Sequence, residues 1–393
     1  MSRVYLDHNA TTPLRAEARA AMIATMDEVG NPSSVHAEGR AAKSIVERAR
    51  GQVAELVGCL PTQIVFTSGA TEAAALAVAQ KARHGGIFAA LPTEHDCLRV
   101  WDEVGLSALH DEQGALSPDG ASRFLGWVSG LAGRTHQENR GDVALVAISA
   151  ANSETGVLAP GERIPADGIV NASRAGSVPY AVVSDITQLA GKAPVSFHSD
   201  EKPSYLILSA HKLGGPKGVG ALVNLTAADP HAMLRGGGQE MGRRSGTENV
   251  IGIAGFGAAA EVAQGDVEAG AWDRVAELRK ILENALAAEA KTTIFVGKDV
   301  PRLPNTSCFI TPGWKGETQV MQMDLAGFAI SAGSACSSGK VRASTVLRAM
   351  GFDEDHASCA IRVSLGLETT EDEVMRFAEA WLAKETKFRA RAA

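Results

Sequence analysis

The sequence of 393 residues has few of the features that mark several large classes of protein. It has only five cysteines, and no two of them form a Cys-x-x-Cys pair, so we predict no zinc knuckle, no ferredoxin-type cluster and no metal site. No apolar run reaches about 18 residues, so we expect no membrane span. There is no basic block and the formal net charge is −7, so we expect no nucleic-acid partner.

The composition that remains is that of a globular protein. Hydrophobic residues make up 45% and charged residues 21%, which is enough to build a large buried core. The length suggests two or three domains, or one large α/β domain with an appendage. Asp7 and His8 stand where a signal peptide needs an apolar stretch, so we expect a cytoplasmic protein.

Short apolar runs alternate with helical patterns through the first two-thirds of the chain. The runs do not alternate with polar residues, which predicts strands buried on both faces of a mostly parallel sheet in an α/β layered domain. The predicted strands are residues 64–67, 87–91, 143–149, 180–184, 205–209 and 218–224. Helices are predicted over residues 14–28, 37–57 and 70 to about 84, and a surface loop over residues 129–141.

The composition changes after about residue 260, which predicts a second, smaller α+β domain. We assign residues 16–260 to the large domain, and residues 1–15 together with 261–393 to the small one. In the small domain we predict helices over residues 273–290, 341–350 and 371–386, and strands over 305–311 and 360–365.

Lys212 follows a predicted buried strand and precedes a turn rich in glycine and proline, from Leu213 to Gly220. Open α/β sheets bind ligands at the carboxyl ends of their strands, and a desolvated lysine there can form a Schiff base. The alternative is a surface lysine in a loop. Neither Gly-x4-Gly-Lys-Ser/Thr nor a Gly-x-Gly-x-x-Gly after the first strand is present, which argues against a P-loop protein and a Rossmann dehydrogenase.

The segment from Ser68 to Glu72 joins a predicted strand to a predicted helix. Its small residues let the backbone approach an anion, and the helix N-terminus offers free N–H groups, so we predict a phosphate cup. The alternative is a helix capped in the ordinary way by Ser68.

Two further strands are followed by titratable groups. Asp185 ends one of them, where a buried carboxylate suits a protonated pyridine nitrogen or, alternatively, caps a helix. His95 follows another, where it can act as an acid or base, stack on a ring, or serve only as a structural hydrogen-bonding group.

Cys336 lies in a run of very small residues from Ser331 to Gly339, with Lys340 and Arg342 nearby. Nearby cations favour a thiolate, although the segment can also be a mobile linker with an incidental cysteine. We expect the other four cysteines to be structural. A Schiff-base lysine, a phosphate cup, a carboxylate, a ring-stacking histidine and a mobile cysteine together indicate a pyridoxal-phosphate enzyme with a cysteine nucleophile.

The sequence resembles the cysteine desulfurases of the NifS/IscS type, in the class V aminotransferase group with fold type I. The matching segments are Tyr5–Pro13, Gly30–Ser34, Thr67–Glu72, Thr93–His95, Ser209–Gly220, Arg244–Thr247, Ser331–Ser337 and Arg362–Gly366. The resemblance implies a large domain with a mostly parallel seven-stranded sheet, and a smaller α+β domain that carries the cysteine loop.

The resemblance also implies roles for individual residues. Lys212 holds pyridoxal 5'-phosphate as a Schiff base, Asp185 pairs with its ring nitrogen, and His95 stacks on the ring and shuttles protons. Arg362 binds the substrate carboxylate and Cys336 accepts the sulfur. The other residues implied at the cofactor are Ala70, Thr71, Gln188, Ser209, His211, Asn152, Ser153 and, from the partner subunit, Thr247; Asn152 and Ser153 are also implied at the substrate.

The implied activity converts L-cysteine to L-alanine and leaves a persulfide on Cys336. The implied partners are a second copy of the chain and a sulfur acceptor, either an iron–sulfur scaffold or a carrier for tRNA thiolation. The alternatives are a selenocysteine lyase or another class V aminotransferase-type enzyme, and a scaffold protein without catalysis.

The chain departs from the family pattern at three places. Ser153 stands where the family has an asparagine, and Ile186 stands where the residue beside the ring pocket is small. The segment that follows Cys336 also differs from that of IscS-like proteins, which bears on the identity of the partner.

Overall fold

The structure, a computed structural model, describes residues 3–107, 109–115, 117–135, 143–159, 174–175, 178–195, 203–333 and 343–392. The strands are β1 (Val4–Tyr5), β2 (Ile64–Thr67), β3 (Phe88–Ala90), β4 (Leu145–Ala147), β5 (Arg174–Ala175), β6 (Val178–Pro179), β7 (Ala181–Asp185), β8 (Tyr205–Ser209), β9 (Gly220–Asn224), β10 (Ile294–Phe295), β11 (Thr306–Ile310), β12 (Phe328–Ala329), β13 (Ser331–Ala332) and β14 (Ala360–Ser364). The helices are α1 (Ala16–Met26), α2 (Ala37–Val57), α3 (Ala70–Val78), α4 (Asp96–Arg99), α5 (Pro118–Thr135), α6 (Val250–Glu268), α7 (Ala271–Glu289), α8 (Gly316–Leu325), α9 (Thr345–Ala349), α10 (Glu354–Ala357) and α11 (Glu371–Ala392). Among the described residues, none of these helices is long and apolar enough to cross a membrane.

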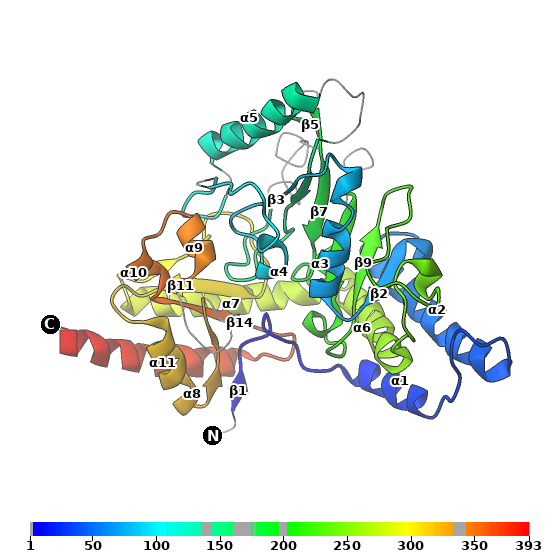
Figure 1. The fold of residues 1–393 in the computed structure, drawn as a ribbon. Helices are drawn as coiled ribbons and strands as arrows, with labels where there is room; N and C mark the ends of the chain where they lie inside the picture. The colour runs from blue at the N-terminus through cyan, green and yellow to red at the C-terminus, as the bar shows by residue number, and fades with distance from the viewer. Residues whose placement is uncertain are drawn as a thin grey trace.

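A mixed sheet lies at the centre of the larger part of the molecule (Figure 1). Its described strands run in the order β2-β9-β8-β7-β4-β3, and only β9 runs against its neighbours. The six strands predicted from apolar runs are all present, and the mostly parallel character is confirmed. The seventh strand, which only the resemblance implied, is absent from this sheet in the described part of the chain.

The strand side chains alternate between two buried faces. Ile64 and Phe66 pack into the cluster formed with α2 and α6, whereas Val65 between them packs against α3 on the other face. Leu206 and Ile207 of β8 divide between the faces in the same way. Because helices cover both faces, no strand position needs to be polar, which explains the uniformly apolar runs.

Helix α5 corrects the predicted surface loop over residues 129–141. Residues 129–135 are helical, and residues 136–141 lie outside the described residues. Phe124, Val128 and Leu131 recur at helical spacing and pack into one cluster with Tyr180. Each glycine in such a segment disfavours a helix by about 1 kcal/mol, but burial of this apolar stripe outweighs that cost.

Helix α3 ends at Val78, earlier than the predicted limit near residue 84, and a single 3₁₀ turn follows over Lys81–Arg83. Gln80 lies between them and is fully buried. Its side-chain amide donates to the carbonyl oxygens of Leu76 and His231, at 2.9 and 3.0 Å. These contacts hold the chain in a turn where the alanine-rich pattern alone predicts more helix.

The smaller part of the molecule has the predicted α+β character. An antiparallel sheet in the order β10-β11-β14-β13 packs with α7, α8 and α11 around Trp314 and Trp381. The predicted strands correspond to β11 and β14, and the predicted helices to α7, α9 and α11. The division of the chain into two domains stays a prediction, and residue 260 itself lies inside α6.

The N-terminal segment joins the two parts. β1 pairs with β12 of the smaller part, and the chain then passes beside residues 211–214 of the larger part (Figure 1). The backbone N–H of Thr12 donates to the carbonyl oxygen of His211 at 3.0 Å, and that of Arg15 to Gly214 at 2.9 Å. This path brings the segment to the edge of the central sheet where five strands end.

Candidate active site

A cavity of about 630 Å³ lies at the carboxyl edge of the central sheet. Its walls come from the segments that follow β2, β3, β4, β7 and β8, because parallel strands end at the same edge. The antiparallel β9 begins there, with Gly220 opposite Ser209. The predicted site residues that line the cavity are Ala70, Thr71, His95, Asn152, Ser153, Asp185, Gln188, Ser209, His211, Lys212 and Arg362.

One predicted site residue is absent from the described lining of this cavity, and another lies outside the described residues. Thr247 is exposed and is not among the residues that line the cavity. Cys336 lies outside the described residues, which stop at Gly333 and resume at Ala343.

Lys212 ends a 3₁₀ turn that directly follows β8. Its Nζ donates to the carbonyl oxygens of Asn9 and Ala10, at 2.5 and 2.9 Å, and the Thr12 hydroxyl donates to its carbonyl oxygen at 3.0 Å. The side chain is half-buried in the cavity wall, so the alternative of a surface lysine is wrong.

The cup at the start of α3 is built from backbone. Gly69 is the N-cap of α3 at φ +155°, and no side chain caps the helix there, so the alternative of a Ser68 cap is wrong. Ser68 instead donates its backbone N–H to Glu72 at 2.7 Å. A Cβ atom on Gly69 would lie 3.8 Å from the Ser209 hydroxyl oxygen, which places that hydroxyl beside the cup. Uncapped N–H groups at a helix N-terminus form an anion site.

His211 lies beside the cup, with its Nδ1 3.1 Å from the Thr11 hydroxyl. Burial, together with the charges of Lys212 and Lys217, lowers the pKa of His211 to about 4. Its imidazole is therefore neutral near pH 7 and can donate one N–H to an anion without adding charge.

Asp185 and His95 approach the cavity from the ends of β7 and β3, the two strands that flank β4 in the sheet. Asp185 ends β7 and is buried, and its Oδ1 accepts the Thr187 N–H at 2.8 Å, so it caps a turn there rather than a helix. His95 is the N-cap of α4, and its Nδ1 accepts the Cys97 N–H at 3.2 Å. Because Nδ1 is an acceptor, the neutral ring carries its proton on Nε2.

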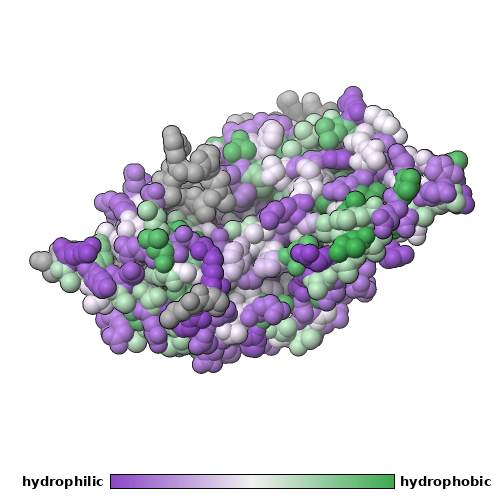
Figure 2. All heavy atoms as spheres, turned by 90° about the horizontal axis from the view of Figure 1, so that it is seen from below, coloured by the Kyte–Doolittle hydropathy of each residue, from purple (hydrophilic) through white to green (hydrophobic). Residues whose placement is uncertain are grey.

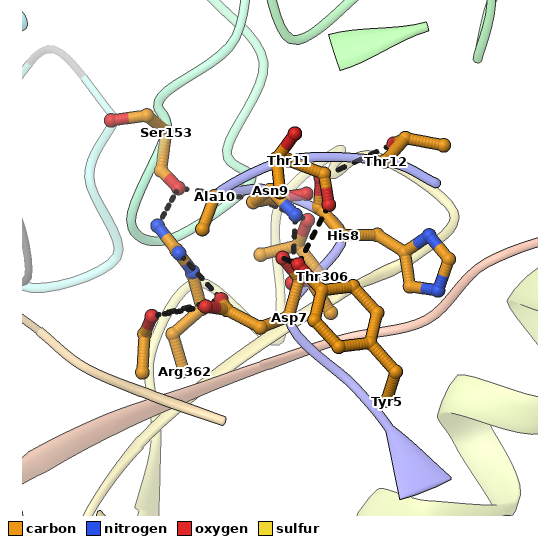
Figure 3. A network of polar contacts seen from close by, with 12 residues as sticks. Tyr5, Asp7, His8, Asn9, Ala10, Thr11, Thr12, Ser153, Thr306 and Arg362 are labelled. Carbon is orange, nitrogen blue, oxygen red and sulfur yellow. Dashed lines mark hydrogen bonds and ion pairs between the residues drawn. The ribbon is translucent and has the colours of Figure 1, made fainter. Parts of the chain in front are cut away.

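Arg362 lies in the middle of β14, next to a carboxylate and a carbonyl (Figure 3). It donates to Asp7 Oδ1 at 2.9 Å and to the carbonyl oxygen of Ser153 at 3.0 Å. The Ser331 hydroxyl lies 2.8 Å from both carboxylate oxygens of Asp7. The buried Nε of Arg362 has no hydrogen-bond partner among the described residues.

Asn152 lines the cavity but uses its amide within the protein. Its Oδ1 accepts the N–H groups of Glu154 and Thr155, both at 2.9 Å, and its Nδ2 donates to Thr93 at 3.0 Å. It therefore holds the turn before His95. Ile186, expected beside the ring pocket, is fully buried in the core formed with α2 and α6 and is not among the cavity residues.

Several residues at the site were not predicted from the sequence. Asn9, Ala10 and Thr11 line the cavity, and Asp7 binds Arg362. Their signal was a polar run directly after the apolar Val4–Leu6, but nothing in that run indicates which distant segment it contacts. Lys192 donates a hydrogen bond to Gln188. The sequence around it does not predict this contact, because a single lysine forms no pattern from which burial could be inferred.

The side chains of Glu94 and Ser149 are joined beside the cavity. The Ser149 N–H donates to Glu94 Oε1 at 2.7 Å, and its hydroxyl donates to Oε2. Glu94 is buried, and burial raises its pKa to about 7. This carboxyl is therefore partly protonated at neutral pH.

The donor set fits pyridoxal phosphate, the cofactor that the sequence resemblance implied. An amine, a carboxylate and an anion cup without a capping side chain face one cavity, with a guanidinium N–H left without a partner. Within the described residues, no group of three or more His, Cys, Asp or Glu side chains could hold a metal ion.

Comparison with known proteins places the chain in a family. The family model described as aminotransferase class-V matches residues 4–377. The chain is 38% identical over 393 residues to a cysteine desulfurase of Cereibacter sphaeroides, covering 96% of this chain and 95% of that protein. It is 41% identical over 397 residues to one of Frankia sp. (strain EuIK1), covering 96% and 90%.

A solved structure supports the same placement. The X-ray structure of a NifS-like protein from Rickettsia africae superposes with a TM-score of 0.81 at 29% identity, covering 96% of this chain and 98% of that one. The fold type I architecture expected from the sequence is thereby confirmed. The chain therefore belongs to the aminotransferase class-V family, among its NifS/IscS-like cysteine desulfurases, which depend on pyridoxal phosphate.

Proposed function

We propose that this chain converts L-cysteine to L-alanine and keeps the released sulfur as a persulfide on Cys336. One observation carries the proposal: Lys212, Asp185, His95 and Arg362, from four separate segments, line a single cavity. The arrangement brings a nucleophilic amine, a carboxylate, an imidazole and a carboxylate-binding group within reach of one small amino acid.

The cofactor would be held at four points. The Lys212 amine would bind its carbonyl carbon, and Asp185 would pair with its ring nitrogen and keep that nitrogen protonated. The N–H groups of Ala70 and Thr71, with Ser209 and His211, would hold the phosphate. The remaining contact, from Gln188, would reach the phenolic oxygen. When bound, pyridoxal phosphate supplies an electron sink for the charge left on the substrate Cα.

The protein's own groups orient the substrate and move its protons. The free Nε of Arg362 would bind the substrate carboxylate while Asp7 and the Ser153 carbonyl keep the guanidinium in place. Lys212 Nζ would remove the Cα proton and later return one. His95, with its proton on Nε2, would serve as the second proton carrier.

The sulfur step is assigned to Cys336 from the resemblance of Ser331–Ser337. Its thiolate attacks the substrate sulfur, so an S–S bond forms as the Cβ–S bond breaks. The electron pair of the broken bond stays with the carbon fragment, which takes up a proton and leaves as alanine. Cys97 also lines the cavity, but burial raises the pKa of its thiol and disfavours a thiolate there.

The test is a single turnover with L-cysteine, followed by mass spectrometry of both cysteine peptides and an assay of alanine. We expect one added sulfur atom on the Cys336 peptide and an equal amount of alanine. The Cys336→Ala variant loses the adduct, whereas the matched Cys97→Ala variant keeps it. An adduct on Cys97 would overturn the assignment of the nucleophile. Turnover of L-selenocysteine with none of L-cysteine would favour a selenocysteine lyase, and amino-group transfer to a keto acid would favour an aminotransferase.

We also propose a homodimer in which Thr247 reaches the cofactor phosphate of the partner subunit. Large apolar side chains are exposed around α1 (Ile23, Met26, Val29 and Val35), and green patches lie at this end of the molecule in Figure 2. Met241, close to Thr247, is also exposed. Apolar surface of this kind is typical of an interface.

A hybrid of two variants tests the shared site. When Lys212→Ala and Thr247→Ala chains are mixed and exchanged, one site per hybrid dimer regains both residues only if Thr247 acts across the interface. We expect activity to reappear on mixing. If Thr247 serves its own chain, no hybrid site is complete and activity stays absent.

The sulfur acceptor is proposed to be an iron–sulfur scaffold or a tRNA-thiolation carrier, and the location is proposed to be the cytoplasm. Both proposals rest on the resemblance and on composition. Transfer of labelled sulfur from the Cys336 persulfide to each kind of purified acceptor would distinguish the two pathways.

A further inference from the structure

Lys192 is a buried lysine for which the mechanism above has no use. It is 3% exposed, and no carboxylate lies within ion-pair distance of it among the described residues. Within the part of the chain that the structure describes, its Nζ donates only to Gln188, to the carbonyl oxygen at 3.1 Å and to the side-chain Oε1 at 2.8 Å. Burying an ammonium group without a counter-ion costs stability, so we expect Lys192 to have a function that offsets this cost.

The lysine determines which end of the Gln188 amide faces it. An ammonium group has three N–H donors and no acceptor, so it can be met only by the amide oxygen. Burial, with the charges of Lys212 and Arg362, lowers the pKa of Lys192 to about 7. The neutral amine still has two N–H groups, enough for both Gln188 oxygens.

A second contact fixes the other end of the same amide. Gln188 Nε2 donates to the carbonyl oxygen of Asn9 at 3.0 Å, and a carbonyl can only accept. That same oxygen accepts from Lys212 Nζ, so Nε2 lies beside the lysine that would hold the cofactor. With Oε1 held by Lys192 and one N–H held by Asn9, the second N–H of Gln188 is the one left for the cavity that this residue lines.

We propose that Lys192 is a positioning residue that locks the Gln188 carboxamide with its N–H groups toward the cavity, so that Gln188 acts as a donor to the phenolic oxygen of the bound cofactor. This inference rests on the proposed contact between Gln188 and that oxygen. Without Lys192, the amide can turn over and present an oxygen, which repels a phenolate.

The test is a double-mutant cycle of Lys192→Met and Gln188→Ala on the cofactor-loaded enzyme. The readout is the pH midpoint of the visible absorbance of the bound cofactor. A donor to the phenolic oxygen favours the less protonated cofactor, so its loss raises the midpoint. We expect each single variant to raise it by about one pH unit, the size of one charge-assisted hydrogen bond. We expect Lys192→Met to add nothing in the Gln188→Ala background, because it acts through Gln188.

The matched control is Gln80→Ala, which removes a fully buried amide that contacts backbone and does not line the cavity. It should lower the thermal midpoint of unfolding and leave the absorbance titration unchanged. If Lys192→Met does not fold, Lys192→Gln is measured instead; its donor is shorter by one bond, and a smaller rise is expected.

Four outcomes distinguish a failure of the positioning role, of the Gln188 contact and of the proposed function. The positioning role would be overturned if Lys192→Met shifted the midpoint equally with and without Gln188. It would also be overturned if Lys192→Met gave no shift while Gln188→Ala gave one. No shift from Gln188→Ala would remove the contact on which the inference rests. A wild-type enzyme that releases no alanine from L-cysteine would refute the proposed function, while the absorbance cycle remains readable.

Discussion

Asp7 and Arg362 form an ion pair although they are 355 positions apart in the chain, with Asp7 Oδ1 2.9 Å from a guanidinium nitrogen. Asp7 follows β1, and Arg362 lies in the middle of β14. Their side chains are 16% and 5% exposed, so the pair is largely shielded from water. The contact closes the N-terminal segment over the site and fixes the group proposed to bind the substrate carboxylate.

Asp7→Ala should destabilise the protein strongly, because it leaves the Arg362 guanidinium buried with no carboxylate in ion-pair contact among the described residues. We expect a loss of about 3 kcal/mol in the free energy of unfolding, measured by urea denaturation of the apoenzyme. The control is Asp324→Ala, which removes the exposed partner of Arg3 and should cost less than about 1 kcal/mol. Equal losses in the two variants would contradict a shielded pair.

Arg362→Lys should weaken substrate binding, because lysine keeps the charge but lacks the free Nε and the planar fork. Loss of one charge-assisted hydrogen bond predicts a rise in KM for L-cysteine of about tenfold or more, with a smaller effect on kcat. Steady-state alanine formation measures both. Arg302→Lys, which alters a bidentate pair with Glu283 that is not part of the cavity wall, should leave KM unchanged.

Gly220→Ala should disrupt the phosphate cup. A Cβ atom there would lie 2.6 Å from Gly69 Cα and 2.6 Å from the Leu208 carbonyl oxygen, and neither backbone atom can move cheaply. We expect faster loss of cofactor on dialysis and a stability loss of about 2 kcal/mol. Gly51→Ala in α2, where nothing lies within 4 Å, should instead raise stability by up to about 1 kcal/mol. Full cofactor retention by Gly220→Ala would argue against a backbone cup.

Glu94→Gln should change how stability depends on pH. Burial raises the pKa of Glu94 to about 7 from its usual value of 4.5, so the folded protein binds the proton more tightly than the unfolded chain. This group's contribution to stability is complete below the unfolded pKa and is lost as pH rises through about 7, by about 3 kcal/mol in all. Glutamine does not titrate, so Glu94→Gln does not lose this stability as the pH rises.

The free energy of unfolding of Glu94→Gln, relative to that of wild type, should therefore rise between about pH 5 and pH 8. Urea unfolding of the two apoenzymes across that range measures the difference. Glu317→Gln, which changes an exposed glutamate, should show no such trend. A difference that does not vary with pH would show that Glu94 is ionised in the folded protein throughout.

Much of the fold and site could be predicted because the relevant signals are local. The middle of a strand covered by helices on both faces needs no polar residue, so β7 and β8 stand out as apolar runs that become polar only at their ends. Parallel strands end at one edge, so Asp185 and Lys212, each next to a strand end, could be placed together. Helix α5 was missed because glycine frequency was given more weight than the apolar spacing of Phe124, Val128 and Leu131.

The remaining features depend on contacts between distant segments. The wall formed by Asn9 and Ala10 meets Lys212 more than 200 positions away, and the local pattern names no partner for it. Lys192 looks like any lysine near a turn until the fold buries it against Gln188. Burial and contacts between distant segments are tertiary properties, and they decide the roles of the Asn9–Ala10 wall and of Lys192.

The path of the N-terminal segment sets an order of events during synthesis. Asn9 and Ala10 leave the ribosome long before β12 and β14, which hold their segment on the side of the smaller part. Until residue 364 has emerged, the wall beside Lys212 has only its contacts with the larger part, at Gln188 and at residues 211–214. A nascent chain can therefore fold its central sheet early, yet the cofactor site is completed only after β14 has emerged.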